Sequence, residues 1–267
     1  MSTPTITGVD LGGRADAPLM LLGPSLGTSA TTLWAAAADQ LAADFRVVGW
    51  ELPGHGHGAP ASAPFTMAEL ARGVLALADE LIGDASDTTG FHLAGDSVGG
   101  AVTLQLALDA PARVLTAAVL CSGARIGSPD AWHERAATVR ASGTGAVVSG
   151  SAQRWFAPGF LDREPARGSA LLHALQVADA ESYALVCEAL AAFDVTERLP
   201  EISAPVLAVA GEHDVPTPPS SLRTIADGVQ HGRLVVLDDV AHLAPAEAPH
   251  DVARLLIDHA GGERAHD

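Results

Sequence analysis

Short, mostly apolar runs alternate with longer segments of helical periodicity along much of this chain, and that alternation limits its possible folds more than any other feature. Runs that are apolar on both sides of the strand alternation are typical of parallel strands covered on both faces. Between them, apolar residues recur at helical spacing. Strands that alternate with helices predict an α/β fold with a mostly parallel, doubly wound sheet. The predicted strands are residues 19–22, 45–50, 91–94, 116–120, 206–210 and 234–237, and the predicted helices are 67–81, 98–108 and 249–260.

Residues 124–194 interrupt the alternation. This segment contains no convincing strand, and its helical pattern is broken by glycine and proline. A length of 267 residues is normal for one α/β enzyme with an insertion. We therefore expect an α/β core made of residues 1–123 and 195–267, with 124–194 inserted between two core strands as a helical cap.

The charge balance excludes several kinds of partner. The chain has 15 basic residues, all arginine, and 32 acidic ones, for a net charge of −17. Such a surface repels nucleic acid and anionic membranes, so we expect neither as a partner. The two cysteines, Cys121 and Cys187, have no metal-type spacing. With no signal-peptide pattern and no apolar run of about 20 residues, the sequence predicts a cytoplasmic protein. It carries no signal for oligomeric state.

The segment Gly95-Asp96-Ser97-Val98-Gly99 joins the predicted strand 91–94 to the predicted helix 98–108. A tight strand-to-helix turn with this G-x-S-x-G pattern raises the serine side chain above the edge of the sheet. The flanking glycines let the strand and the helix approach closely. We therefore expect Ser97 to be a catalytic nucleophile and Asp96 to take no part in the chemistry.

A serine hydroxyl needs a base within hydrogen-bonding reach and an acid that orients this base. Among 11 histidines, His242 follows the predicted strand 234–237 and falls at the carboxyl edge of the sheet, like Ser97. His213 is the alternative base. His92 lies within a strand and is expected to be a packed core residue. Three further histidines are expected to be solvated: His250, His259 and His266.

The acid is expected in the loop after the predicted strand 206–210, because the chain order in this type of site is serine, acid, histidine. Asp214 in that loop is the predicted acid, and Glu212 is the alternative. The alternative to a catalytic role is that Asp214 only forms an ordinary Asx turn before Pro216.

The first predicted core strand runs into Gly23-Pro24-Ser25-Leu26-Gly27. Small residues here let a backbone N–H face the serine, and we expect the N–H groups of Leu26 and Val98 to form an oxyanion hole. A plain glycine–proline turn is the alternative, and Ser25 either contacts substrate or caps the loop. His55-Gly56-His57 lacks a nearby cysteine or carboxylate, so we expect no metal site.

Four landmarks, in chain order, resemble the α/β-hydrolase superfamily over nearly the full chain. They are Gly23-Pro24-Ser25-Leu26-Gly27, Pro53-Gly54-His55-Gly56, Gly95-Asp96-Ser97-Val98-Gly99-Gly100, and Asp214 with His242. Within this superfamily, the chain is similar to the 3-oxoadipate enol-lactonases of the β-ketoadipate pathway. Ser25-Leu26-Gly27-Thr28 and the segment 126–135 carry that resemblance, together with Arg154-Trp155-Phe156. The chain departs from the family pattern at Pro24, where asparagine is expected, and at Asp96-Ser97-Val98.

The resemblance implies a cofactor-free enzyme that opens an unsaturated five-membered lactone bearing a carboxymethyl group. Ser97 would attack the lactone carbonyl while His242 takes its proton. The leaving enol would become a ketone, and water activated by His242 would then release 3-oxoadipate.

The predicted cap also carries an unusual charge for this chain. Residues 124–167 hold six arginines and four acids, a net charge of +2, whereas the rest of the chain carries −19. A guanidinium can hold a carboxylate through two hydrogen bonds. We expect Arg135 and Arg154 to bind substrate, with Trp132 and Trp155 as pocket walls. The alternative is that these arginines are solvated or paired with neighbours.

Other hydrolases of the same fold are rival interpretations: a carboxylesterase, a carbon–carbon bond hydrolase or a cofactor-free perhydrolase. The predicted triad does not separate these activities. A haloalkane dehalogenase is disfavoured because it would have aspartate at position 97. A non-catalytic binding protein is a further alternative, and the filled triad positions argue against it.

Overall fold

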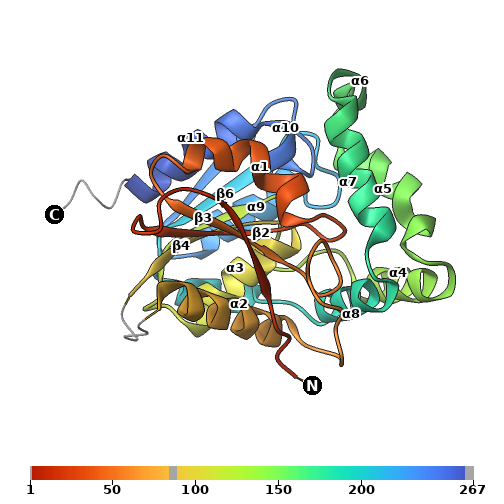
Figure 1. Cartoon of the computed structure of the whole chain (residues 1–267), viewed down its shortest axis with the longest axis horizontal. Coiled ribbons are helices and arrows are strands. Elements are labelled where there is room, and N and C mark those ends of the chain that lie inside the picture. Colours follow the sequence, from red (N-terminus) through yellow and green to blue (C-terminus); the bar gives the residue numbers. More distant parts are fainter. Residues whose placement is uncertain (1, 84–88, 262–267) are drawn as a thin grey trace.

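A seven-stranded sheet runs through the middle of the protein in the strand order β1-β3-β2-β4-β5-β6-β7 (Figure 1). The computed structural model describes residues 2–83 and 89–261. All neighbouring strands are parallel except β1, which pairs antiparallel with β3. The strands are β1 (Thr7–Gly12), β2 (Leu19–Gly23), β3 (Arg46–Glu51), β4 (Phe91–Asp96), β5 (Val114–Leu120), β6 (Val206–Gly211) and β7 (Gly232–Leu237).

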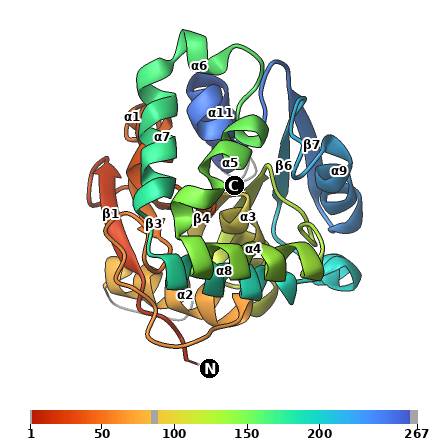
Figure 2. The same ribbon diagram turned by 90° about the vertical axis from the view of Figure 1, so that its right-hand side faces the viewer.

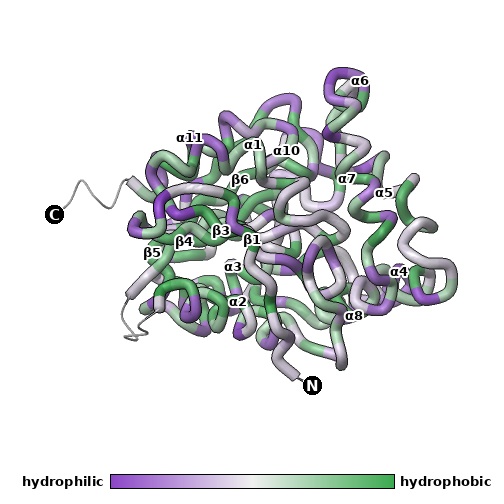
Figure 3. Tube along the Cα trace, viewed as in Figure 1, coloured by the Kyte–Doolittle hydropathy of each residue, from purple (hydrophilic) through white to green (hydrophobic). Residues whose placement is uncertain are grey.

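The central strands are covered on both faces. Every residue of β2, β4 and β6 is buried, and the hydropathy colouring shows apolar segments through the middle of the molecule (Figure 3). Burial on both faces removes the polar half of the strand alternation, which is why these runs are apolar throughout. The predicted parallel α/β sheet is confirmed, and each predicted strand overlaps an observed one.

Helices cover the two faces of the sheet. Helices α1 and α11 pack together over one face, and α2 and α3 pack together over the other (Figure 1). Helix α9 packs against β6 and β7. Among the described residues, no helix combines the length and the apolar character needed to cross a bilayer. These helices are α1 (Ala30–Leu41), α2 (Met67–Ile82), α3 (Val98–Asp109), α9 (Pro219–Gly228), α10 (Ala244–Glu247) and α11 (Pro249–Gly261).

Four elements of the core escaped the sequence analysis: β1, α1, α9 and the short α10. Residues of β1 alternate between intermediate and exposed at its start, and the strand includes two glycines. Its pattern is therefore much weaker than that of a strand buried on both faces. Helix α9 lacks a side-chain cap at its start, which leaves Pro219 at the first helical position as its start signal.

A group of helices lies between β5 and β6 in the sequence. They gather on one side of the molecule, where α4 packs along α8 (Figures 1 and 2). Residues 121–205 are all described, and none of them is in a strand. The elements are α4 (Pro129–Ser142), the 3₁₀ turn η1 (Thr144–Val147), α5 (Val148–Trp155), α6 (Phe160–Arg163), α7 (Pro165–Val177), α8 (Ala180–Ala191) and a second 3₁₀ turn, η2 (Thr196–Glu201).

Helix α3 lies directly against the end of β4, because neither element has a side chain at the contact. A Cβ atom on Gly95 would lie 2.2 Å from the carbonyl carbon of Gly99. A Cβ on Gly99 would lie 2.7 Å from the carbonyl carbon of Gly23 at the end of β2. Both contacts are with backbone, which cannot rotate away. The two glycines therefore set the distance between helix and sheet beneath Ser97.

We expect Gly95→Ala to lower the free energy of unfolding by at least about 1–3 kcal/mol, since the added methyl group overpacks this contact. Gly145→Ala is the matched control, because a Cβ there meets nothing within 4 Å. Urea denaturation followed by circular dichroism measures both variants. Equal stability of the two variants would contradict the close approach of α3 and β4.

Candidate active site

Ser97 has a backbone conformation that L-amino acids rarely adopt, with φ 53° and ψ −113°. It lies between the last residue of β4 and the first residue of α3. Its N–H donates to the carbonyl of Leu120 at 2.9 Å, and the Ser122 hydroxyl donates to the Ser97 carbonyl at 2.7 Å. Such a conformation persists only where surrounding contacts hold it in place. These bonds to the end of β5 supply such contacts.

A continuous chain of hydrogen bonds joins Ser97, His242 and Asp214. His242 Nε2 lies 3.0 Å from Ser97 Oγ. On the other side of the ring, Nδ1 lies 3.0 Å from each carboxylate oxygen of Asp214. All three residues are buried. The serine, acid and base candidates of the sequence analysis therefore meet at hydrogen-bonding distance.

Thr217 completes the surroundings of Asp214 and was missed by the sequence analysis. Its N–H donates to Asp214 Oδ1 at 3.0 Å, and its hydroxyl donates to Oδ2 at 2.7 Å. These bonds fix the plane of the carboxylate that faces His242. The only signal for them was the spacing of three residues from Asp214, which also fits an ordinary Asx turn.

A pocket of about 510 Å³ opens above Ser97 and His242. The candidate substrate-binding residues of the sequence analysis all line it: Ser25, Trp132, Arg135, Arg154 and Trp155. Leu26 lines the pocket as well, whereas Asp214 and Val98 do not. Tyr183 and Val215 contribute to the lining without having been singled out beforehand. The pocket therefore combines residues that follow β2, β4, β6 and β7 with residues of the inserted helices.

Two backbone N–H groups beside Ser97 remain available as donors. The N–H of Leu26 makes no hydrogen bond to any residue that the structure describes. Val98 is the first residue of α3, so its N–H has no acceptor within the helix. The positive end of the helix dipole lies at the same place. Both groups have the chemistry that an oxyanion hole requires.

The two pocket arginines have no acidic partner. Arg135 donates from Nε to the Tyr183 hydroxyl at 2.8 Å and from Nη2 to the Ser151 hydroxyl at 2.9 Å, both neutral groups. The side chain of Arg154 makes no hydrogen bond or ion pair within the described chain. Burial lowers the pKa of Arg154, and the nearby charge of Arg135 lowers it further. Glu134 also lines the pocket, but neither arginine forms an ion pair with it or with any other described acid.

Arg140 belongs to the same group of helices and, unlike the pocket arginines, has acidic partners. It lies on α4, outside the pocket lining, and pairs with Glu181 at 2.7 Å as well as with Glu188. The arginines that face the pocket differ from Arg140 in having no acidic partner, as does Arg163 of α6, which donates to the carbonyl of Pro158 instead.

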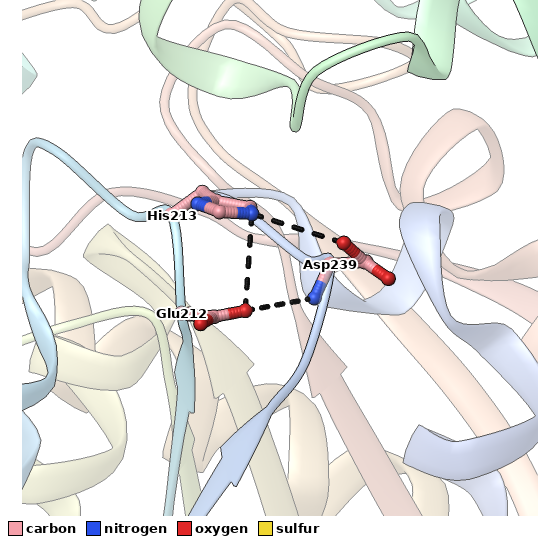
Figure 4. A group of neighbouring side chains, drawn as sticks. All are labelled: Glu212, His213 and Asp239. Carbon is pink, nitrogen blue, oxygen red and sulfur yellow. Dashed lines mark hydrogen bonds and ion pairs between the residues drawn. The ribbon is translucent and has the colours of Figure 1, made fainter.

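The alternative base and acid, His213 and Glu212, lie together on the loop that precedes Asp214 (Figure 4). His213 Nε2 is 3.8 Å from a Glu212 carboxylate oxygen and 3.9 Å from Asp239. None of the three lines the pocket. Their contacts join the loop after β6 to the loop after β7, at a place separate from Ser97.

Of the remaining histidines, His259 was expected to be solvated, and that prediction was wrong. His259 Nε2 lies 3.1 Å from the carbonyl of Ala117, and burial lowers its pKa. His92 is buried against Thr116, and His250 is exposed. His266 lies outside the described residues. His55 is buried near Tyr183, and burial lowers its pKa to about 4, so it is neutral at pH 7.

Asp96 is fully buried beside Ser97. Burial raises the pKa of its carboxyl well above the ordinary value, and the negative charges of Asp214 and Glu247 raise it further. A carboxyl in such surroundings is favoured in its neutral form. The carboxylate that is hydrogen-bonded to His242 is that of Asp214.

Comparison with known proteins identifies the family. A profile of the α/β-hydrolase family matches residues 20–255. The chain is 34% identical to 3-oxoadipate enol-lactonase 2 of Acinetobacter baylyi, over 89% of this chain and 86% of that protein. It is 32% identical to 3-oxoadipate enol-lactonase 1 of the same organism, over 90% of this chain and 88% of that protein. The crystal structure of the enol-lactonase from Burkholderia xenovorans LB400 superposes with a TM-score of 0.88 at 32% identity, covering 95% of each chain. This chain belongs to the α/β-hydrolase family.

Proposed function

We propose that this hydrolase opens the lactone ring of 3-oxoadipate enol-lactone to give 3-oxoadipate, through a catalytic triad of Ser97, His242 and Asp214. One observation carries the choice of substrate. The pocket above Ser97 contains Arg135 and Arg154, and neither forms an ion pair with an acid, although Glu134 also lines the pocket. A lactone with a carboxymethyl group supplies the missing negative charge. The names of the two Acinetobacter relatives point to the same substrate.

The first half of the proposed reaction forms an acyl-enzyme. Ser97 Oγ attacks the lactone carbonyl while His242 Nε2, 3.0 Å away, takes its proton. Asp214 stabilises the imidazolium that forms. The N–H groups of Leu26 and Val98 bind the negative carbonyl oxygen, and each such donor is worth about 3 kcal/mol. The ring oxygen leaves as an enolate and takes the proton from His242, and the resulting enol tautomerises to a ketone.

The second half returns the free enzyme. A water molecule gives its proton to His242 and attacks the acyl carbonyl, and the same two N–H groups bind the oxyanion. Ser97 then leaves with the proton held by His242. The product carries one carboxylate more than the lactone, and no cofactor takes part.

We assign substrate recognition to the inserted helices, with residues 124–194 acting as a cap over the core. Arg154 and Arg135 bind the substrate carboxylate through charge-assisted hydrogen bonds. Trp132 and Trp155 form apolar walls around the ring, and Ser25 lies beside the reacting carbonyl. All five residues line the pocket, so they are in reach of one bound molecule.

Turnover of freshly prepared 3-oxoadipate enol-lactone, followed by ultraviolet absorbance, tests this proposal. We expect kcat/KM for the lactone to exceed that for p-nitrophenyl acetate by at least about a hundredfold, since two charge-assisted contacts are absent with the neutral ester. Equal values for the two compounds would refute the lactonase assignment and favour a general carboxylesterase.

Arg154→Ala tests the carboxylate contact separately from the chemistry. We expect KM for the lactone to rise about 10- to 100-fold, because a hydrogen bond to a charged group contributes about 1.5–3 kcal/mol. KM for p-nitrophenyl acetate should change little. Arg140→Ala is the matched control, since Arg140 is paired with Glu181 and Glu188 outside the pocket. The measurement is the steady-state kinetics of both variants on both compounds. If Arg154→Ala changes KM equally for the lactone and for p-nitrophenyl acetate, Arg154 does not bind the substrate carboxylate.

A further inference from the structure

The carboxylate of Glu247 connects two segments that meet at the active site. Glu247 is the last residue of α10, the short helix that follows His242. One oxygen, Oε1, accepts a hydrogen bond from the N–H of Ala241 at 2.9 Å. The other, Oε2, accepts one from the N–H of Ala157 at 2.7 Å. Glu247 therefore ties the loop before His242 to the chain that follows α5.

Two further hydrogen bonds run between the same parts of the structure. The N–H of His242 donates to the carbonyl of Trp155 at 3.1 Å. The guanidinium of Arg167, on α7, donates to the carbonyl of Ala246 at 2.9 Å. The backbone of the histidine is thus bonded directly to a residue that lines the pocket. Any shift of residues 154–157 is transmitted to His242 through these contacts.

Both carboxylate oxygens of Glu247 take part in this connection. Burial raises the pKa of its carboxyl overall, although the backbone N–H groups of Ala157, Ala241 and Leu243 and the charge of His242 lower it. Each oxygen accepts one backbone N–H, so each of the two segments is bonded to its own oxygen. A neutral amide would place a second donor against one of these N–H groups.

We infer that Glu247 is a positioning residue, which holds His242 in line with Ser97 and holds Trp155 and Arg154 at the pocket wall. It touches neither the substrate nor the reacting atoms. The inference rests on the proposed roles of Ser97 and His242 as nucleophile and base. Its consequence is that one side chain affects two kinetic parameters: kcat, through the alignment of His242, and KM for an anionic substrate, through the placement of Arg154.

Glu247→Gln is the decisive variant, because it keeps the size of the side chain and removes one of the two acceptors. We expect kcat for p-nitrophenyl acetate to fall about tenfold or more, since a buried N–H left without a partner costs about 1–3 kcal/mol. We expect KM for the lactone to rise at least about threefold, with KM for the neutral ester unchanged. Glu212→Gln, an exposed carboxylate on the neighbouring loop, is the matched control and should change neither parameter.

Labelling of Ser97 by a fluorophosphonate probe counts the competent sites, so that kcat refers to folded protein only. If Glu247→Gln yields no folded protein, Arg167→Gln supplies the same test, because it breaks the bond to Ala246 and leaves Glu247 in place. Arg167→Gln should lower kcat and raise KM for the lactone, as Glu247→Gln does, but both changes should be smaller.

A lowered melting temperature with unchanged kcat per labelled site and unchanged KM overturns the inference and leaves Glu247 a purely structural residue. Failure of the lactonase proposal gives a different result: the wild-type protein then does not turn over the lactone preferentially. In that case the dependence of kcat on Glu247 is still measured with p-nitrophenyl acetate.

Discussion

Ser97→Ala should reduce kcat/KM by at least about 10⁴-fold for every ester or lactone that the protein hydrolyses. The variant lacks the oxygen that forms the acyl-enzyme, and among the described residues no other hydroxyl is hydrogen-bonded to His242 Nε2 as Ser97 Oγ is, at 3.0 Å. The remaining rate comes from binding and from the oxyanion donors alone. Steady-state hydrolysis of p-nitrophenyl acetate and of the lactone measures the loss.

The fold should tolerate this change. The N–H and carbonyl of residue 97 keep their bonds to Leu120 and Ser122, so we expect the free energy of unfolding to change by less than about 1 kcal/mol. Ser220→Ala, at an exposed serine of α9, is the control and should keep full activity. A fluorophosphonate probe should label the control and leave Ser97→Ala unlabelled. Labelling of Ser97→Ala would show that another residue is the nucleophile.

Asp214→Asn should reduce kcat by about 10³- to 10⁴-fold, as loss of the acid does in serine hydrolases of other folds. Both oxygens of Asp214 lie 3.0 Å from His242 Nδ1, and together they favour the tautomer that carries its proton there. An amide nitrogen in that place donates instead, so the ring turns its unprotonated nitrogen toward residue 214. Nε2 is then protonated and cannot accept the proton of Ser97.

Glu212→Gln separates Asp214 from the alternative acid. Glu212 is exposed, and its contacts are with His213 and Asp239 outside the pocket, so we expect activity within about twofold of wild type. Thr217 keeps its N–H bond in both variants. Rates of p-nitrophenyl acetate hydrolysis by the two proteins give the comparison. If Glu212→Gln lowered the rate more than Asp214→Asn, the catalytic acid would be Glu212.

The sequence predicts well those features that depend on residues close together in the chain. The strand, turn and helix around Ser97 lie within one stretch of chain, so their pattern is visible without the fold. The parallel strands are visible because burial on both faces requires apolar residues at nearly every position. Strand β1 is not predicted because its residues are half-exposed, so its apolar pattern is weak. Its hydrogen-bonded partner, β3, lies elsewhere in the sequence.

The residues that were missed act through hydrogen bonds that the sequence does not reveal. Thr217 bonds to Asp214, three residues before it, but a threonine at that spacing also fits an ordinary turn. Glu247 bonds to Ala157, which is distant in the sequence. His259 was expected in solvent because it falls in the last helix, whereas the carbonyls that it meets belong to β5 and to Pro205. Periodicity reports which face of a helix is apolar, and it does not report which polar atoms that helix covers.

The unneutralised arginines of the pocket have a thermodynamic consequence that can be observed without any reaction. Two like charges held close together in a half-buried site raise the free energy of the empty folded state. An anion that binds between them removes this cost and stabilises the folded protein in proportion to the logarithm of its concentration. Melting temperatures measured with and without dicarboxylates that cannot be hydrolysed therefore show whether the pocket binds anions, without any reaction.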